Sequence, residues 1–387
     1  MWKIFKSIKD IISSGGGASE GHGDKSVKAP DVFEPYRVRC LYEPVKDRKR
    51  VVHAIANFMT GGSSRLVVDI IERLGHIYEH EVVTSHNPKP PCYTGLIIHE
   101  YRHLGSPDPV SDYFSKFRPE LVHIHYWGDC DRAWYENIIK AAERYGCKII
   151  ENVNTPVEPY FSDSIDRYVY VSDYVLNAFG RVDGKSLTIY PGSDFNIFTK
   201  VDIQDVPDDC IGMVYRLECD KLNEKAIDVF IKVVKRRPST KVLIVGGGTY
   251  MKVYKEAVNN AGVMDSFEFT GYVSYERLHV LYGMMSIFVA PVWKESFGQV
   301  SPFAMNMGIP VVGYDVGALS EIIGARDLLA PQGDSERLAE IIIGLLEDRK
   351  KRLSIGMANM ERARALFSVE VMIKSYAELY EDLLKGT

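Results

Sequence analysis

Two kinds of hydrophobic pattern alternate along most of the chain. From about residue 50, short runs rich in β-branched residues, such as VVHAIAN and LVHIHYW, are followed by segments such as RLVVDIIERL, whose apolar residues recur every three or four positions. Buried strands produce the first pattern, and helices that pack through one face produce the second. This alternation predicts an α/β fold in which parallel sheets are covered by helices.

The alternation runs through the chain twice. The first series ends at LTIYPGSDFNIF, the acidic and non-periodic stretch TKVDIQDVPDD follows, and the second series starts at IGMVYRL. We therefore predict a Rossmann-like domain over residues 37–199, a second Rossmann-like domain over 200–366, and a final helix, 367–387, that crosses back to the first domain. Ligands of such sheets bind beyond the carboxyl ends of the strands, so we expect the site in a cleft between the domains.

Residues 1–36 have a different character. The segment MWKIFKSIKDII places its apolar side chains, from Trp2 to Ile12, at three- and four-residue steps with the lysines largely off that stripe, and a Gly/Ser-rich stretch follows. The stretch predicts a flexible linker. Two interpretations of residues 1–12 stay open: a helix that lies on an anionic membrane, or a helix or leader without membrane contact. The segment is not a secretory signal, because lysines interrupt its apolar residues and no continuous hydrophobic stretch follows.

Composition narrows the class of protein. The chain has 387 residues, 47 basic and 52 acidic side chains, a net charge of −5 and 46% hydrophobic residues. These values are typical of a globular protein and argue against nucleic acid as a partner. Six scattered cysteines form no zinc-type pair and indicate reduced thiols in the cytoplasm. No apolar run approaches the roughly 20 residues of a membrane span.

Two groups of residues carry candidate chemistry. Glu295 follows the buried run SIFVAPV, and we expect Ser296, Phe297 and Gly298 to open a helix whose backbone N–H groups bind an anion. Arg216 and Lys221 follow the strand IGMVY. Two cations at one strand end would stabilise the negative charge on a departing phosphate, although such a pair is also common on solvated surfaces.

Together with other segments, these residues resemble the retaining family 4 glycosyltransferases, which have the glycosyltransferase B fold of two facing Rossmann-like domains. The resemblance runs from about residue 50 to the C-terminus, and its ten parts come in family order. They are GGSSR (61–65), LVHIHYW (121–127), YVYVSDYV (168–175), YPGSDFNIF (190–198), YRLECDK (215–221), VGGG (245–248), FTGYVSYERL (269–278), APVWKESFG (290–298), MGIPVVGYDVGALSEII (307–323) and FSVEVMIKSYAELY (367–380).

The resemblance implies roles for single residues. Arg216 and Lys221 would bind the donor diphosphate, Glu295 would hold hydroxyls of the donor sugar, and His125 would reach that sugar near the reacting centre. The other implied donor-binding positions are Gly61 and Gly62 in a glycine loop, Phe297, Gly298, Gln299 and Val300 after the acid, and Gly271, Tyr272 and Val273 beside the base. A lone histidine on an apolar strand can also be a core residue, and we interpret His123 as structural.

The chain departs from the family pattern at three places. Phe303 stands where the family has a second acid, which holds the ribose of the donor. The loss of that acid could cost about 1.5–3 kcal/mol of donor affinity. Tyr215 replaces a usual glycine, and ENVNTP lacks a histidine often found after that strand. These departures put the shape of the donor pocket and the acceptor side in question.

The resemblance implies a hexosyltransferase-type reaction (EC 2.4). A sugar would pass, with retention, from a nucleoside-diphosphate sugar, UDP-sugar before GDP-sugar, to a hydroxyl of a glycan or glycolipid, without a metal or other cofactor. The leaving diphosphate could deprotonate the acceptor, so no protein nucleophile is required. Two alternatives remain: a catalytically silent sugar-nucleotide-binding subunit, which Phe303 favours, and an epimerase or phosphorylase of the same fold. We expect a cytoplasmic protein, in peripheral membrane contact if residues 1–12 bind lipid.

Overall fold

The structure is a computed structural model that describes residues 35–199 and 208–385. The amphipathic segment, the linker after it and most of the acidic stretch TKVDIQDVPDD lie outside the described residues. The described chain forms two compact units. Of the described residues, 35–193 and 365–385 form the N-terminal unit, and 194–199 and 208–364 form the C-terminal unit.

The N-terminal unit is built on a seven-stranded sheet in which every neighbouring pair of strands is parallel. The strand order is β5-β3-β2-β6-β7-β8-β9. The strands are β2 (Lys49–Asn57), β3 (Tyr78–His86), β5 (Ile98–Glu100), β6 (Leu121–Tyr126), β7 (Lys148–Val153), β8 (Arg167–Tyr170) and β9 (Ser186–Thr188). Two short strands, β1 (Tyr36–Arg37) and β4 (Tyr93–Thr94), pair separately.

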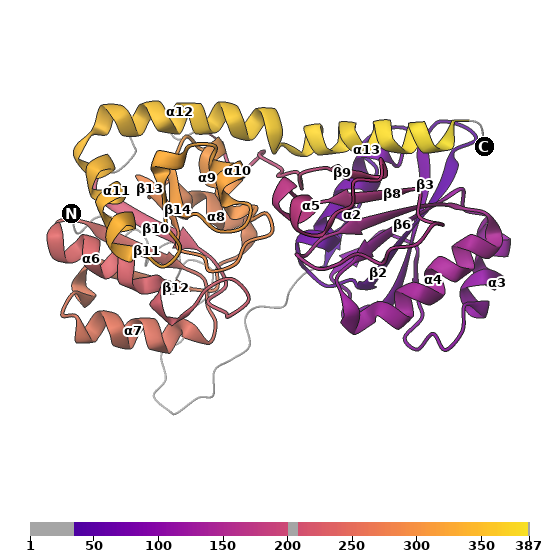
Figure 1. The fold of residues 1–387 in the computed structure, drawn as a ribbon, viewed down its shortest axis with the longest axis horizontal. Coiled ribbons are helices and arrows are strands. Elements are labelled where there is room, and N and C mark those ends of the chain that lie inside the picture. Colours follow the sequence, from indigo (N-terminus) through magenta and orange to yellow (C-terminus); the bar gives the residue numbers. More distant parts are fainter. Residues whose placement is uncertain (1–34, 200–207, 386–387) are drawn as a thin grey trace, which may run out of the picture. The chain divides into compact units, whose positions relative to one another are not determined.

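Helices cover both faces of this sheet (Figure 1). One face packs against α2 (Gly62–Leu74) and α13 (Val369–Leu384). The other packs against α3 (Asp108–Phe117), α4 (Arg132–Tyr145) and α5 (Asp173–Phe179). Helix α13 starts where the Ser368 hydroxyl accepts the Val371 N–H, and its apolar residues recur at three- and four-residue steps toward the sheet. The last helix therefore completes the core of the N-terminal unit.

The C-terminal unit has a six-stranded parallel sheet of order β12-β11-β10-β13-β14-β15. Its strands are β10 (Cys210–Val214), β11 (Lys241–Val245), β12 (Phe267–Gly271), β13 (Ile287–Ala290), β14 (Val311–Tyr314) and β15 (Leu329–Ala330). Numbered along the chain, this is the 3-2-1-4-5-6 order of a Rossmann sheet. The two parallel sheets confirm the predicted α/β class, and the N-terminal sheet has the same order with one strand added.

The connections between these strands are the expected helices. They are η2 (Glu224–Ile227), α6 (Asp228–Arg236), α7 (Tyr250–Asn260), α8 (Tyr275–Tyr282), α9 (Val300–Asn306) and α10 (Leu319–Ile323), and two further helices, α11 (Ser335–Glu347) and α12 (Arg349–Leu366), follow the last strand. Strand order reverses between β10 and β13, so the loops after these two strands meet at the point where such sheets bind ligands. Within the described ranges, we find no helix with both the length and the apolar character that a bilayer crossing requires.

Candidate active site

Most predicted donor-binding residues lie at one edge of the C-terminal sheet. Arg216 and Lys221 follow β10, Gly271 ends β12, and Glu295 follows β13. These strands are parallel, so their carboxyl ends share an edge. The structure thus brings residues from three loops, far apart in sequence, to one side of the sheet.

A buried charge pair joins the loops after β10 and β13. The Nζ of Lys221 lies 2.6 Å from Oε1 of Glu295, whose side chain is fully buried, whereas that of Lys221 is 35% exposed. The backbone reinforces this contact, because the Trp293 N–H donates to the Lys221 carbonyl at 2.6 Å. The second carboxylate oxygen, Oε2 of Glu295, is buried without a hydrogen-bond partner. Glu295 therefore has one oxygen fixed by a cation and one acceptor left for another donor.

Two glycines enclose this acid. Gly298 has φ +84°, and a Cβ there would lie 2.6 Å from Oε2 of Glu295. Gly317, after β14, has φ +57°, and the Ala318 N–H next to it donates to the Glu295 carbonyl at 3.2 Å. A Cβ on Gly317 would overlap that carbonyl, so both positions require glycine. Gly317 was not among the predicted site residues, although it stands in the motif MGIPVVGYDVGALSEII.

Arg216 is the most accessible of the predicted charged residues. Its side chain is 69% exposed and forms an ion pair with Asp220 at 2.6 Å. Such exposed pairs add little stability, so an anion could compete for the guanidinium. The backbone beside it is held by the turn after β11, where the Leu217 N–H donates to the Gly247 carbonyl at 2.9 Å. That turn, which includes Gly246, joins β11 to α7.

The turn after β12 presents an aromatic ring. The Gly246 N–H donates to the Gly271 carbonyl at 3.0 Å, which links the turns after β11 and β12. The Tyr272 ring is 70% exposed and lies over Gly247, where an added Cβ would come within 2.6 Å of it. Val273 follows on the same turn. An exposed ring at this edge could stack on a planar base.

The helix expected to start at Ser296 to Gly298 starts later. Helix α9 begins at Val300 and has seven residues, so Phe297 and Gly298 lie in the loop before it and Gln299 is its N-cap. The left-handed φ of Gly298 is the reason, because that conformation cannot belong to a right-handed helix. Phe297 is buried, at 3% exposure, and its amide is not part of a helix N-terminus. The prediction that Ser296, Phe297 and Gly298 open this helix and bind an anion through its first N–H groups was therefore wrong.

Phe303 lies in an aromatic cluster. Its ring stacks on Phe198, with the ring centroids 4.0 Å apart. The rings of Tyr275 and Phe195 form T-shaped pairs with it, with centroid distances of 6.0 and 6.4 Å. The Asn306 side chain donates to the Phe198 carbonyl at 2.7 Å and holds that segment in place. Position 303 therefore contributes packing and no acceptor for a ribose hydroxyl.

The N-terminal unit holds the remaining predicted residues. Gly61 is the N-cap of α2 and Gly62 its first residue, and both are exposed. No side chain caps this end and no acid lies in its first turn, so the first N–H groups face no negative side chain of their own helix. Gly61 has an extended φ of 178°, so no backbone strain demands glycine there.

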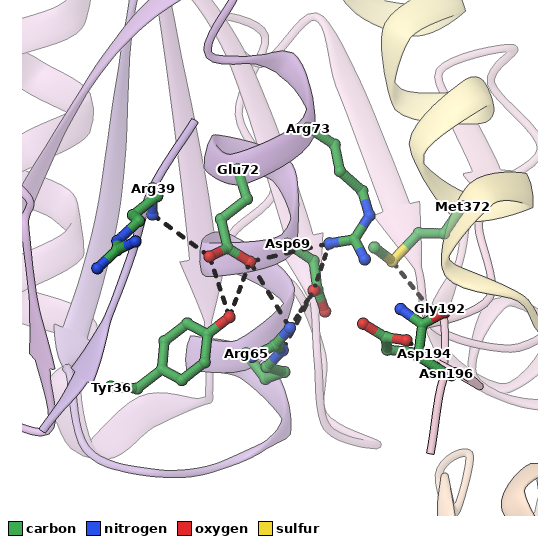
Figure 2. Close-up of polar contacts among 10 residues, drawn as sticks. All are labelled: Tyr36, Arg39, Arg65, Asp69, Glu72, Arg73, Gly192, Asp194, Asn196 and Met372. Carbon is green, nitrogen blue, oxygen red and sulfur yellow. Dashed lines mark hydrogen bonds and ion pairs between the residues drawn. The ribbon is translucent and has the colours of Figure 1, made fainter. Parts of the chain in front are cut away.

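Helix α2 is held by a network of charges that the sequence analysis missed (Figure 2). Asp69, 1% exposed, accepts hydrogen bonds from Arg65 at 2.8 Å and Arg73 at 2.9 Å. Glu72 accepts the Tyr36 hydroxyl at 3.1 Å, and the Arg65 guanidinium lies 5.0 Å from the Tyr36 ring centre. Burial raises the pKa of Asp69, and the charge of Arg65 opposes that rise. The four-residue spacing of Arg65, Asp69 and Arg73 was the available signal.

His125 lies inside the N-terminal unit with other histidines. Its Nε2 is 3.2 Å from Nδ1 of His53, whose Nε2 is 3.1 Å from Nδ1 of His80. His123 shares the face of His125, and its Nδ1 is 2.7 Å from the Tyr380 hydroxyl. His53, His123 and His125 are fully buried. The role of His125 toward a donor sugar stays a prediction.

These imidazoles are neutral at physiological pH. Burial lowers the pKa of His53 and His125 well below the usual value and brings that of His123 to about 3. One nitrogen from each of these three rings lies within 4.8 Å of the others, a spacing at which they could hold a metal ion. A metal ion is not needed to explain this spacing, because His53 and His125 are joined by a hydrogen bond. The three residues also include no carboxylate that would balance the charge of a buried dication.

Comparison with known proteins points to one family. Residues 200–362 match the family model described as glycosyl transferases group 1. A lipopolysaccharide core biosynthesis mannosyltransferase, LpsB of Rhizobium meliloti, is 27% identical over 184 residues, which are 45% of this chain and 52% of that protein. The match thus spans about half the length of this relative.

Solved structures share the fold across most of the chain. A glycosyltransferase from Rickettsia africae superposes with a TM-score of 0.74 at 16% identity, over 88% of this chain and 100% of that one. Anabaena HepE in complex with UDP gives a TM-score of 0.72 at 17% identity, over 86% and 100%. Residues 200–362 therefore match the group 1 glycosyl transferases, and the chain has the fold of solved glycosyltransferases.

Proposed function

We propose that this protein is a retaining, metal-independent glycosyltransferase that moves a sugar from a nucleoside-diphosphate sugar to a hydroxyl of a glycan or lipid-linked acceptor. The observation that carries the proposal is Glu295, which is buried, fixed by Lys221 through Oε1, and unpartnered at Oε2. A UDP-sugar is favoured over a GDP-sugar because the similar HepE structure is a complex with UDP. The glycan acceptor is supported by the name of the lipopolysaccharide core relative.

Each charged residue has a role in this proposal. Oε2 of Glu295 accepts a hydroxyl of the donor sugar, and Arg216 and Lys221 stabilise the departing diphosphate. The bond between the anomeric carbon and the phosphate oxygen breaks, and its electron pair stays on the diphosphate. The acceptor oxygen bonds to the anomeric carbon on the same face, and its proton passes to the diphosphate. No side chain forms a covalent bond to the sugar.

Phe303 favours a second candidate function. A protein that binds a sugar nucleotide without turnover could dispense with an acid that fixes the ribose, and position 303 is used for aromatic packing instead. Such a subunit would scaffold or activate a partner enzyme. It would bind donor but release no nucleoside diphosphate, with or without an acceptor.

We also propose that the protein works in the cytoplasm and contacts an anionic membrane through residues 1–12. The amphipathic, lysine-rich pattern of that segment supports the contact, and six unpaired cysteines support a reducing compartment. Deletion of residues 1–30 should abolish binding to anionic liposomes and leave nucleotide binding intact. Equal liposome binding by the shortened chain would contradict the membrane contact.

Transfer itself is tested by proton NMR of the product. Candidate sugar nucleotides are incubated with lipopolysaccharide core or capsular oligosaccharides, in buffer with and without EDTA, and the anomeric coupling constant of the new linkage is compared with that of the donor. We expect the same anomeric configuration and no effect of EDTA. Inversion or loss of transfer in EDTA would overturn the mechanism, and free hydrolysis or epimerisation without acceptor would favour another reaction.

A further inference from the structure

Three buried polar atoms without hydrogen-bond partners lie at the candidate donor site. They are Oε2 of Glu295, Oη of Tyr215 and Oγ of Ser301. The three residues are 4%, 6% and 0% exposed. They come from three elements: Tyr215 directly follows β10, Glu295 lies in the loop after β13, and Ser301 is in the first turn of α9.

The three groups share one neighbourhood. The Ser301 N–H donates to the Gly298 carbonyl at 3.1 Å, and a Cβ on Gly298 would lie 2.6 Å from Oε2 of Glu295. Burial and then the charge of Glu295 raise the pKa of the Tyr215 hydroxyl, and the nearby Ser301 side chain acts in the opposite direction. Tyr215 therefore keeps its proton at neutral pH and can donate it in a hydrogen bond. Its ring is also held in place, since it packs 6.1 Å from the Phe288 ring on β13.

A site of this kind needs a partner. Burying a polar group without a hydrogen bond costs free energy, and folded proteins keep few such groups. Here three of them are concentrated beside the acid that the proposed function assigns to the donor sugar. Two hydroxyls that can donate or accept and one carboxylate oxygen that accepts match the hydroxyls of a sugar. A phosphate fits poorly, because the Glu295 carboxylate would repel it.

We infer that the hydroxyls of Tyr215 and Ser301, together with Oε2 of Glu295, form a subsite that binds hydroxyls of the transferred sugar and selects among donor sugars. The inference rests on the proposed function. Glycine at position 215, the usual residue in the resembled family, would provide neither the hydroxyl nor the ring. This chain therefore recognises its sugar with a side chain at that position.

The test compares two ligands on the full chain by calorimetry: a nucleoside diphosphate and the corresponding sugar nucleotide. The variants are Tyr215→Phe and Ser301→Ala. The matched control is Tyr254→Phe, a buried tyrosine of the same unit whose hydroxyl donates to the Asn223 carbonyl at 2.7 Å. We expect each test variant to raise the Kd of the sugar nucleotide by about fivefold to tenfold and to leave that of the nucleoside diphosphate unchanged.

A second readout addresses selection. Sugar nucleotides that differ at one hydroxyl should be discriminated by the wild type, and the discrimination should shrink in Tyr215→Phe while the control retains it. Unchanged sugar-nucleotide affinity in both variants, as expected if ordered water fills the subsite, overturns the inference. So does an equal loss for both ligands. If the wild type binds no nucleotide at all, the proposed function fails instead.

Discussion

The Nζ of Lys221 and Oε1 of Glu295 lie 2.6 Å apart although 74 residues separate them in the chain. The pair joins two loops at the point where the strand order of the C-terminal sheet reverses. Because the Glu295 side chain is fully buried, loss of this lysine would leave a buried carboxylate without its cation. The contact therefore links the stability of the unit to the geometry of the candidate donor site.

Removing the lysine should cost more stability than removing a more exposed cation nearby. Lys221→Met leaves a buried carboxylate unpaired, and we expect the free energy of unfolding to fall by about 2 kcal/mol. Arg216→Ala breaks only an exposed pair with Asp220, so a change within about 0.5 kcal/mol is expected. Urea denaturation followed by circular dichroism measures both. An equal fall in the free energy of unfolding in the two variants would show that the buried pair contributes no more stability than the exposed pair.

The glycine between β14 and α10 should not tolerate a side chain. Gly317→Ala places a methyl group against the Glu295 carbonyl at a left-handed φ, so we expect a loss of about 2 kcal/mol or more. Gly344→Ala is the matched control, because nothing lies within 4 Å of a Cβ in that helix position. It should stabilise by up to about 1 kcal/mol. A neutral Gly317→Ala in thermal unfolding would contradict the close packing of this loop.

The buried histidines should make the N-terminal unit sensitive to acid. Burial lowers the pKa of His80 and His123 to about 3, while the unfolded chain takes up these protons near pH 6.5. The unfolded state thus binds more protons between these values. Stability is full above about pH 6.5 and falls with acid, by about 1.4 kcal/mol per pH unit for each such histidine.

Variants separate this effect from that of carboxylates. His80→Gln should reduce by one the number of protons taken up on unfolding between pH 6 and pH 4. His103→Gln is the control, since that histidine is exposed, and it should leave proton uptake unchanged. Urea denaturation at a series of pH values gives the proton uptake on unfolding of each variant, from the slope of stability against pH. The same proton uptake in wild type and His80→Gln would contradict a neutral, partly buried His80.

Restoring the missing family acid should not restore a ribose contact. Phe303→Glu removes the ring that stacks on Phe198 and places a charge in an aromatic cluster. We expect a loss of about 3 kcal/mol or more in the free energy of unfolding and no gain in nucleotide affinity. Thermal unfolding and calorimetry test this in one preparation. Tighter nucleotide binding by Phe303→Glu would mean that position 303 does face the ribose.

The sequence was sufficient to predict both sheets because their strands are short β-branched runs between helices of clear period. The start of α9 was missed, since only the backbone shows that Gly298 adopts a left-handed φ. Periodicity alone does not report such a conformation.

Contacts across the chain explain the other gaps. The stacking of Phe303 on Phe198 joins residues 105 positions apart, and no local pattern predicts it. The histidine cluster depends on strand order: His53 is level with His123 only because β2 and β6 are neighbours in the sheet. The sequence did contain a signal for this cluster. VVHAIAN and LVHIHYW are strand runs of the same kind, and both place histidines among apolar residues.

The central claim, that this chain binds a sugar nucleotide through the loops after β10 and β13, is tested most directly by calorimetry. UDP, GDP, ADP and CMP, with their common sugars, are titrated into the wild type, Arg216→Ala, and the control Arg337→Ala, an exposed arginine paired with Glu340. We predict selective binding of one nucleotide, UDP first, lost in Arg216→Ala and retained in the control. Absence of binding by every nucleotide, or equal binding by all three proteins, would contradict it.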